Sequence, residues 1–436
     1  MDTEKLKQKI LDLAIRGKLV PQDSNDESAE ELIKKIQEEK AKLVKEGKIK
    51  ASKEESIIFK GSDNCYYEND KEILFDEPLE VSNNIIWMKG KDFLFPMEST
   101  KPCGEEFQYI DIDSIDNKNN IINKKIIKST NAPSRASRKT YPTSTLFSMV
   151  RPYLRNIAFV GEENVNAIAS TGFFVCTPMP FVNPEYLFIL MTSKYVVDGL
   201  NYFMKGDNSP SIIKGDIEKF LFPIPSLEYQ NKVLGLLEKI MPKLNVLRNS
   251  QEELVNVVKV TKRKILDDIF SENSSYKSYY ENEYFLGDLL PYEQPALYIV
   301  KSTIYDDKYD TPVLTPGKSF ILGYTNEKEG VYHVNNSKVI IFDDFTTASR
   351  IIDFDFKVKS SAMKILKSSD ETKFNIDYLY FLLQTLYVNN DTHKRYWISE
   401  FATKKVKVHT YDEQLKIVKT INDITTKLDY IIDSKI

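Results

Sequence analysis

The sequence contains only three cysteines, Cys65, Cys103 and Cys176, which are too few and too widely spaced for a disulfide framework or a cysteine metal site. It also lacks any run of about 18 apolar residues. The residues after Met1 are charged and do not match a secretory signal, so we expect the chain to be neither membrane-spanning nor secreted. These absences predict a cytoplasmic protein whose thiols stay reduced.

Catalytic signatures are missing as well. The sequence has no glycine-rich cofactor loop, no Asn-Pro-Pro-aromatic motif and no phosphate-binding Gly-x-x-x-x-Gly-Lys-Ser/Thr loop. Asn183 to Tyr186 and Asp355 to Lys357 only partly resemble a methyltransferase and a metal-nuclease motif, respectively. The three histidines, His333, His393 and His409, share no ligand spacing with a cysteine. We therefore predict no catalytic residue, no metal site and no directly bound cofactor.

What the chain does have is length, and positive charge gathered in one segment. Its 436 residues exceed what one core usually organises, so at least two domains are expected. A net charge of −4 argues against nucleic-acid binding, but the distribution of charge matters more than the sum. Residues 117 to 161 contain no Asp or Glu. The basic residues of this acid-free stretch are Lys118, Lys124, Lys125, Lys128, Arg135, Arg138, Lys139, Arg151 and Arg155.

Apolar periodicity predicts three helical regions. A short helix is expected over Leu6 to Leu13, and a second begins at the capping box opened by Ser28. From Ser226 to Phe270 apolar residues follow a 4-3 spacing that is typical of a coiled-coil helix, and about 45 residues would span roughly 68 Å. Pro242 interrupts this region and is expected to kink or split it.

Between the helical regions the pattern changes to short β-branched and aromatic runs broken by Pro, Asn and Gly. These runs extend from Ile57 to Pro223 and from Phe285 to Val408, with helical pieces near Pro184 to Phe203 and Asp377 to Tyr387. Each stretch predicts a mixed α/β domain.

An internal repeat relates the helical regions to one another. The segment from Gln230 through Val233 to Leu247 recurs 184 residues later, from Gln414 through Ile417 to Ile431. Lys264-Ile265-Leu266-Asp267 also has a counterpart, Lys9-Ile10-Leu11-Asp12, near the start of the chain. The chain is therefore interpreted as two copies of a domain followed by a helix, circularly permuted, with two-fold pseudosymmetry. A plain duplication joined by a structural coiled coil is the alternative.

Two segments carry a family resemblance that extends over nearly the whole chain. Leu6 to Gln22 resembles a conserved helical region of the specificity subunits of type I restriction-modification systems, and Phe222 to Gln230 resembles the exit from one of their target-recognition domains. The resemblance implies an α+β fold in which two α/β target-recognition domains are separated by two long conserved helical regions that form an antiparallel coiled coil. The implied boundaries are 1–50 for the N-terminal helical region, 51–225 and 274–410 for the recognition domains, 226–273 for the central helical spacer and 411–436 for the C-terminal helix.

The same resemblance implies the function and the partners. Each domain would read half of a bipartite site in double-stranded DNA, and the helical regions would set the spacer and dock two methyltransferase subunits. Restriction and translocase subunits would join, and S-adenosylmethionine, ATP and Mg²⁺ are expected on those partners. Two alternatives remain: a catalytic methyltransferase or endonuclease component, and a structural coiled-coil adaptor without sequence readout.

Polar and basic loops supply the candidate DNA contacts, because Arg can pair with guanine, Asn with adenine, and Ser or Thr with either base edges or phosphate. The alternative for each is an ordinary solvated loop or turn. For Asp343 and Asp344, a role as turn residues is favoured over cytosine readout. The candidates are Ser134, Arg135, Arg138, Lys139, Arg151, Arg155, Lys205 and Asn208 in the first domain, and Lys318, Thr325, Asn326, Thr346, Thr347 and Arg350 in the second.

Overall fold

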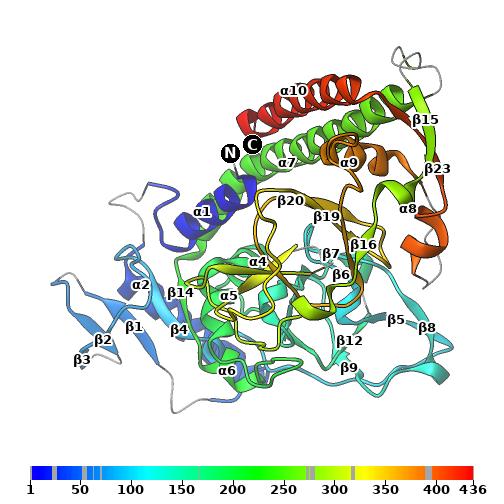
Figure 1. Cartoon of the computed structure of the whole chain (residues 1–436). Coiled ribbons are helices and arrows are strands. Elements are labelled where there is room, and N and C mark those ends of the chain that lie inside the picture. Colours follow the sequence, from blue (N-terminus) through cyan, green and yellow to red (C-terminus); the bar gives the residue numbers. More distant parts are fainter. Residues whose placement is uncertain are drawn as a thin grey trace. The chain divides into compact units, whose positions relative to one another are not determined.

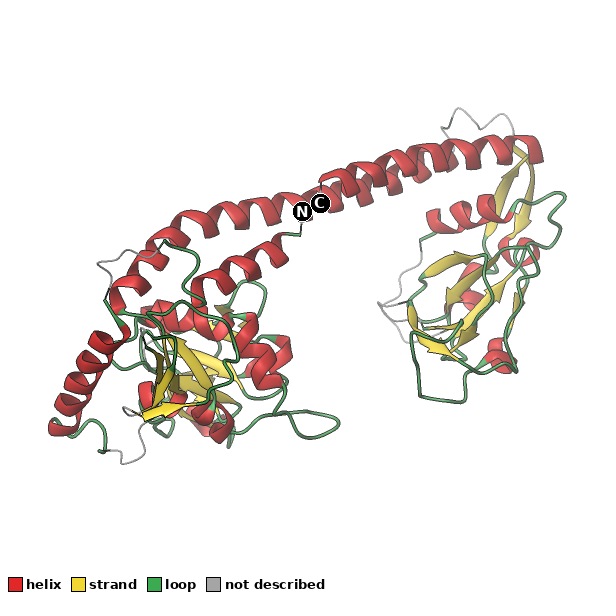
Figure 2. Cartoon of the chain, turned by 90° about the vertical axis from the view of Figure 1, so that its left-hand side faces the viewer, coloured by secondary structure: helices red, strands yellow, loops and turns green. Residues whose placement is uncertain are grey.

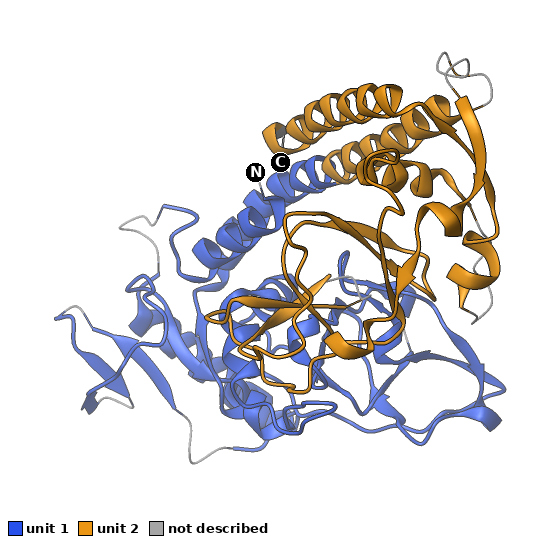
Figure 3. Cartoon of the chain, viewed as in Figure 1, with its two compact units in different colours: residues 1–248 blue, residues 249–436 orange. Residues whose placement is uncertain are grey.

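The computed structural model describes residues 2–21, 27–51, 56–61, 63–68, 71–164, 166–271, 274, 280–315, 320–387 and 395–435. The chain divides into two compact units, residues 1–248 and 249–436, and each contains both helices and sheets (Figures 1 and 3). The predicted α+β class is confirmed. Within the described ranges, no helix is long and apolar enough to cross a membrane.

Two helices open the first unit, and both begin at caps that are visible in the sequence. α1 (Thr3–Ile15) follows Asp2, whose carboxylate accepts hydrogen bonds from two backbone amides of the first turn. α2 (Ala29–Lys45) begins with the predicted capping box, in which the Ser28 hydroxyl accepts from the Glu31 amide and the Glu31 carboxylate accepts from the Ser28 amide. Both predicted helices are confirmed.

The remaining elements of the first unit form a mixed α/β body. Its other short helices are α3 (Gly90–Phe93), α4 (Pro184–Thr192), α5 (Lys194–Asn201) and α6 (Lys214–Lys219). Its strands are β1 (Ile57–Lys60), β2 (Tyr66–Glu68), β3 (Lys71–Ile73), β4 (Ile86–Lys89), β5 (Glu106–Ile110), β6 (Ile115–Asp116), β7 (Ile121–Ile122), β8 (Ile126–Lys128), β9 (Ala136–Lys139), β10 (Thr145–Ser148), β11 (Ile157–Phe159), β12 (Ile168–Ser170), β13 (Phe173–Cys176) and β14 (Leu221–Ile224).

The strand order places the chain exit at the edge of one sheet. One sheet has the order β14-β4-β1-β2-β3, and β14 pairs antiparallel with β4. The other described sheets are β11-β10-β13, β8-β5-β12-β9 and β6-β7. A single apolar core includes Ile36 of α2, Trp87 of β4, Leu187 of α4 and Phe222 of β14, all of them fully buried. This core places the strand that leads into the next helix in the interior of the domain.

The central helix α7 (Leu227–Phe270) is 44 residues long and includes Pro242, so of the two expected effects of the proline, a kink or a split, the split is wrong. Figures 1 and 2 show the helix as one continuous ribbon. The ring of Pro242 is exposed, so it enters no packed seam, and proline removes only one helical hydrogen bond. The predicted seam is partly confirmed by burial, since Val233, Leu237 and Val258 are buried.

The second unit repeats the mixed composition. Its helices are α8 (Leu286–Leu289), α9 (Ile376–Thr385) and α10 (Tyr411–Lys435). Its strands are β15 (Tyr280–Phe285), β16 (Tyr292–Glu293), β17 (Thr311–Leu314), β18 (Ile321–Thr325), β19 (Val339–Asp343), β20 (Ser349–Ile352), β21 (Lys357–Val358), β22 (Met363–Leu366) and β23 (Lys405–His409). The described sheets are β16-β22-β19-β20, β18-β17-β21 and β15-β23.

The internal repeat is visible in how each unit packs by itself. In the first unit, Leu11 of α1, Tyr186 of α4 and Val233 and Leu237 of α7 form one apolar cluster. Three helices from distant parts of the sequence therefore meet where the domain joins its long helix.

The second unit contains the equivalent cluster. Leu266 at the end of α7, Tyr378 of α9 and Ile417 and Ile421 of α10 pack together. Leu266 corresponds to Leu11 in the sequence repeat, and the two isoleucines correspond to Val233 and Leu237. The repeated segments thus make equivalent apolar contacts in both units, which supports the circular pseudo-two-fold repeat.

Candidate nucleic-acid interface

The acid-free stretch supplies a group of exposed basic side chains on the first unit. Lys118, Lys124, Lys128 and Arg135 are exposed, and none of them has an ion pair within the described residues. Lys124 and Lys128 lie at edge strand β8, and Arg135 lies just before the opposite edge strand, β9, of the same sheet. Exposed cations of this kind can neutralise phosphates.

Two other cations of the stretch are paired with acids from outside it. Lys125 Nζ lies 2.5 Å from Asp111 Oδ2, and Lys139 Nζ lies 2.9 Å from Glu98 Oε2. The hydrogen bond to Asp111 raises the pKa of Lys125, and hydrogen bonds with Tyr141 and Glu98 raise the pKa of Lys139. Both groups stay positive, but a nearby carboxylate already offsets part of their charge.

Ser134 and Arg135 form a turn ahead of β9, and both side chains are exposed. The Ala136 amide closes the turn on the Pro133 carbonyl at 2.9 Å, and the Arg135 carbonyl accepts from the Thr171 amide at 2.9 Å. Backbone bonds therefore fix the turn, and the Arg135 side chain takes no part in holding it. Arg138 is half-buried within β9.

Arg151 and Arg155 lie in a loop that the structure shows to be held by their own side chains. Both residues have left-handed backbone conformations, with φ of 48° and 56°. Arg151 donates to the Asn208 carbonyl at 2.7 Å, and Arg155 donates to the Thr192 carbonyl at 2.8 Å. The two arginines therefore support the loop, while Lys205 and the side chain of Asn208 are exposed on its neighbour.

Exposed aromatic side chains beside this loop were not identified from the sequence. Tyr153, between the two arginines, is 46% exposed, and Tyr202, at the end of α5, is 92% exposed. Aromatic rings beside cations are a common platform for stacking on nucleic-acid bases. The only sequence signal was the placement of Tyr153 between Arg151 and Arg155.

The first predicted loop region of the second domain is only partly available. Lys318 lies outside the described residues. Thr325 is 1% exposed and its hydroxyl accepts from the Glu327 amide at 3.3 Å, so its side chain cannot reach DNA, contrary to the prediction. The adjacent Asn326 is exposed.

The turn between β19 and β20 is fixed from within and presents polar side chains. Asp343 accepts from the Phe345 amide at 2.9 Å and from the Thr346 hydroxyl at 2.6 Å. Thr347 has a φ of 61°, which is strained for a β-branched residue and often marks a functional turn. Arg350 is exposed, and its guanidinium lies 4.6 Å from the centre of the Phe320 ring.

A buried ion pair lies beneath this turn. Lys364 Nζ is 3.4 Å from Asp344 Oδ2, and both side chains are fully buried. The other carboxylate oxygen of Asp344 accepts from the Trp397 amide at 2.8 Å. Asp343, the last residue of β19, and Asp344, the first residue of the turn, thus both have structural contacts here, in line with the role favoured from the sequence over cytosine readout.

The histidines show ordinary structural contacts. His333 Nδ1 lies 2.5 Å from Asp355 Oδ2 on the surface, and buried His409 Nδ1 lies 2.7 Å from the Tyr378 hydroxyl. His393 is outside the described residues. Across the described ranges, no group of three or more His, Cys, Asp or Glu side chains is placed to hold a metal ion.

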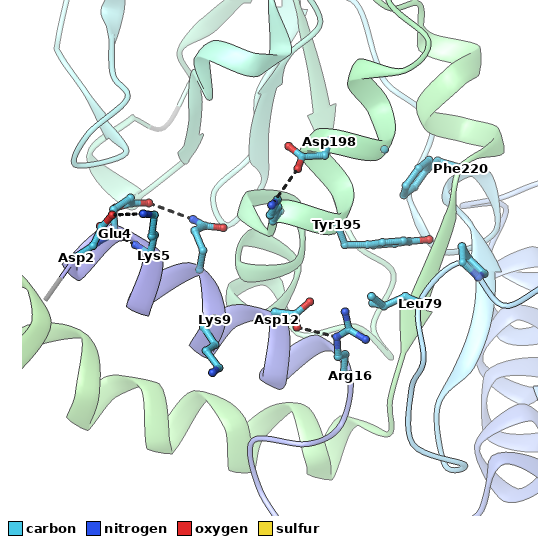
Figure 4. A pocket seen from close by; sticks show the side chains of 14 residues that line it. Asp2, Glu4, Lys5, Lys9, Asp12, Arg16, Leu79, Tyr195, Asp198 and Phe220 are labelled. Atoms are coloured by element: carbon cyan, nitrogen blue, oxygen red, sulfur yellow. Dashed lines mark hydrogen bonds and ion pairs between the residues drawn. The ribbon is translucent and has the colours of Figure 1, made fainter. Parts of the chain in front are cut away.

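A pocket of about 900 Å³ lies beside α1 and α5 in the first unit (Figure 4). Three ion pairs lie along it: Asp2 with Lys5, Asp12 with Arg16, and Lys194 with Asp198. Leu79, Tyr195 and Phe220 add apolar surface to its lining. Six of the eight charged residues in the lining are paired in this way, and Glu4 accepts a hydrogen bond from the Gln8 side-chain amide at 3.2 Å.

Sequence comparison links the chain to one class of protein. The specificity subunit of the type I restriction enzymes EcoR124I and EcoR124II of Escherichia coli is 48% identical over 147 residues, which are 33% of this chain and 36% of that protein. The EcoEI specificity subunit of Escherichia coli is 24% identical over 249 residues, 55% of this chain and 39% of that protein. The matches thus span little more than a third of these relatives. No family model matches the chain.

Structural comparison supports the fold. A solved structure described as the basis of complex assembly and conformational transition of the type I restriction-modification system matches with a TM-score of 0.58 and 21% identity. The match covers 81% of this chain and 93% of that chain. The resemblance to type I specificity subunits that was predicted from Leu6 to Gln22 and Phe222 to Gln230 is confirmed.

Proposed function

We propose that this chain, a relative of type I restriction enzyme specificity subunits, is the DNA-reading subunit of such a complex and has no catalytic site of its own. Each mixed domain reads one half of a bipartite target in double-stranded DNA. The observation that carries the proposal is the repeated junction, in which each unit seats its domain on an equivalent three-helix cluster. Two reading domains on repeated helices suit a split site, just as dimers suit palindromes.

The helical regions provide the surface for partners. Val246, Val255, Val257 and Val260 of α7 are each at least 41% exposed, which leaves apolar side chains of this helix open to a partner. Two methyltransferase subunits bind there, and restriction and translocase subunits complete the complex. S-adenosylmethionine, ATP and Mg²⁺ are bound by these partners.

The direct test is to purify the chain with the products of its neighbouring genes and to map methylated adenines in DNA treated with the complex. We expect one motif made of two short half-sites separated by a fixed number of unspecified base pairs. A continuous motif, or methylation without sequence preference, would contradict the proposal.

Without its partner subunits, the chain is expected to have neither methyltransferase nor nuclease activity. The chain alone, incubated with S-adenosylmethionine, Mg²⁺ and target DNA, should give neither methylated nor cleaved product, because the cofactor-binding motifs are absent from its sequence. Radiolabelled methyl transfer and gel analysis measure the two activities. Product that persists after further purification would favour the alternative of a catalytic methyltransferase or endonuclease.

Salt dependence tests the basic group on the first unit. We expect Arg135→Ala to lower the slope of log affinity against log salt by about 0.9, because an exposed phosphate contact releases counterions. Lys139→Ala should change the slope less, since Glu98 already pairs with that lysine. Lys34→Ala, on the exposed face of α2, is the control. An unchanged slope for Arg135→Ala, with unchanged base preference, would show that this turn does not contact DNA.

A further inference from the structure

A buried glutamine stands at the same position of both long helices. Gln230 is the fourth residue of α7, and Gln414 is the fourth residue of α10. The two side chains are 0% and 1% exposed. Both glutamines also begin the repeated segment. The repeat alone does not explain why a polar side chain lies inside an apolar junction.

In the first unit, the Gln230 amide joins three parts of the chain. Its Oε1 accepts from the Asn183 amide at 2.7 Å, at the cap of α4. Its Nε2 donates to the Phe181 carbonyl at 3.2 Å and to the Pro225 carbonyl at 2.9 Å. Pro225 directly follows β14, the strand by which the chain leaves the domain.

In the second unit, Gln414 repeats this geometry bond for bond. Its Oε1 accepts from the Asn375 amide at 2.8 Å, at the cap of α9, and its Nε2 donates to the carbonyls of Lys373 and His409 at 3.0 and 2.9 Å. His409 ends β23, again the strand by which the chain leaves the domain. The acceptor and both donors of each amide are used in the same order.

A side-chain carboxamide satisfies this arrangement. One acceptor must face a backbone N–H while two donors face carbonyl groups, and the side-chain amide carries both on one rigid plane. The apolar clusters beside it tolerate sliding, since contact between methyl groups has little directional preference. Three directional bonds at one corner fix the angle between exit strand, capped helix and long helix.

We propose that Gln230 and Gln414 are positioning residues that hold each reading domain at one angle on its helix and so set how strictly the half-site separation is selected. This inference rests on the proposed function. In this proposal the length of α7 sets the preferred spacer length, whereas two buried side chains that do not contact DNA set how strongly other spacer lengths are rejected.

The test uses the full chain in its methyltransferase complex. Gln230→Met and Gln414→Met keep the side-chain length but remove all three bonds, and Gln→Glu at either position keeps only the acceptor. Competition binding is measured on DNA in which the mapped spacer is one base pair shorter, native or one base pair longer. Each methionine variant is expected to lose at least roughly tenfold of its discrimination against the altered spacers. Discrimination among single-base changes within the half-sites should stay within about twofold of wild type.

Gln37→Met, on the exposed face of α2, is the matched control and should leave spacer discrimination unchanged. Unaltered spacer discrimination in folded Gln230→Met and Gln414→Met would overturn the inference, and so would an equal loss of base and spacer discrimination. Failure of the wild-type complex to select any bipartite site would instead refute the proposed function.

Amide hydrogen exchange of the DNA-free chain tests, without the complex, whether the hydrogen bonds of Gln230 and Gln414 hold each domain on its long helix. Gln230→Met should speed exchange of peptides spanning 181–186 and leave those spanning 373–378 unchanged, and Gln414→Met should do the reverse. If a methionine variant does not fold, the same comparison is made with the glutamate variant. Unchanged exchange in both peptides, 181–186 and 373–378, would overturn the inference, because it would show that the glutamine hydrogen bonds do not hold these segments in place.

Discussion

Inserting four residues into α7 is expected to lengthen the DNA spacer by one or two base pairs and to leave both half-sites unchanged. The suitable point is between Ser250 and Gln251, in the middle of the 44-residue helix. Methylation mapping of the purified complex reads the spacer and the half-sites from the same experiment.

The expected size follows from helix geometry. Four residues add about 6 Å at 1.5 Å each, and base pairs in B-DNA rise about 3.4 Å, so the added length corresponds to fewer than two base pairs. Four residues also rotate the following segment by about 40°, whereas seven residues keep a 3.5-residue seam in register and add about 10.5 Å. A seven-residue insertion should therefore lengthen the spacer by up to three base pairs with less loss of affinity.

Replacing the exposed Asn249, Ser250, Glu252 and Glu253 by four other residues, without changing the length, is the control, and it should leave the spacer unchanged. An unaltered spacer in both insertion variants, with half-sites intact, would refute the idea that α7 measures the distance. Gln230→Met is expected to give a different result from the insertions. It should broaden the range of spacer lengths that the complex accepts, whereas the insertions should change the preferred spacer length.

Helices and the repeat could be predicted because their signals are local. The capping box at Ser28 and the apolar spacing from Val233 onward specify helices within a few turns of sequence, and tertiary packing agrees with them. Pro242 does not split the helix, because a proline on an exposed face removes one hydrogen bond without entering the buried seam.

The candidate site was less predictable because it depends on contacts between distant residues. The acid-free stretch seemed uniformly positive, but Asp111 and Glu98 reach it from preceding strands and loops. Thr325 is buried at the end of β18. One polar residue in a short strand does not show which of its side chains point into the core and which point to solvent. The left-handed conformation of Arg151 likewise had no sequence signal, since such positions usually favour glycine or asparagine.

Asp344→Asn is expected to destabilise the second unit by about 3–5 kcal/mol, because it leaves the ammonium of Lys364 buried without a counter-ion. Asparagine keeps the shape and can still accept from the Trp397 amide, so the change isolates the charge. Lys364→Met added to Asp344→Asn should restore most of the loss, since burying two neutral groups avoids the unpaired charge.

Chemical denaturation followed by tryptophan fluorescence makes the measurement specific to one unit. Trp87 lies in the core of the first unit and Trp397 in that of the second, and both are fully buried. With Trp87→Phe as the background, Trp397 reports the second unit alone, and its transition should move to lower denaturant in Asp344→Asn. The pair lies beneath the turn that carries Thr346 and Thr347, so base preference should weaken at one half-site only, the one read by the second domain. Loss of stability below about 1 kcal/mol, or no recovery in the double variant, would show that the pair is not what holds this turn in place.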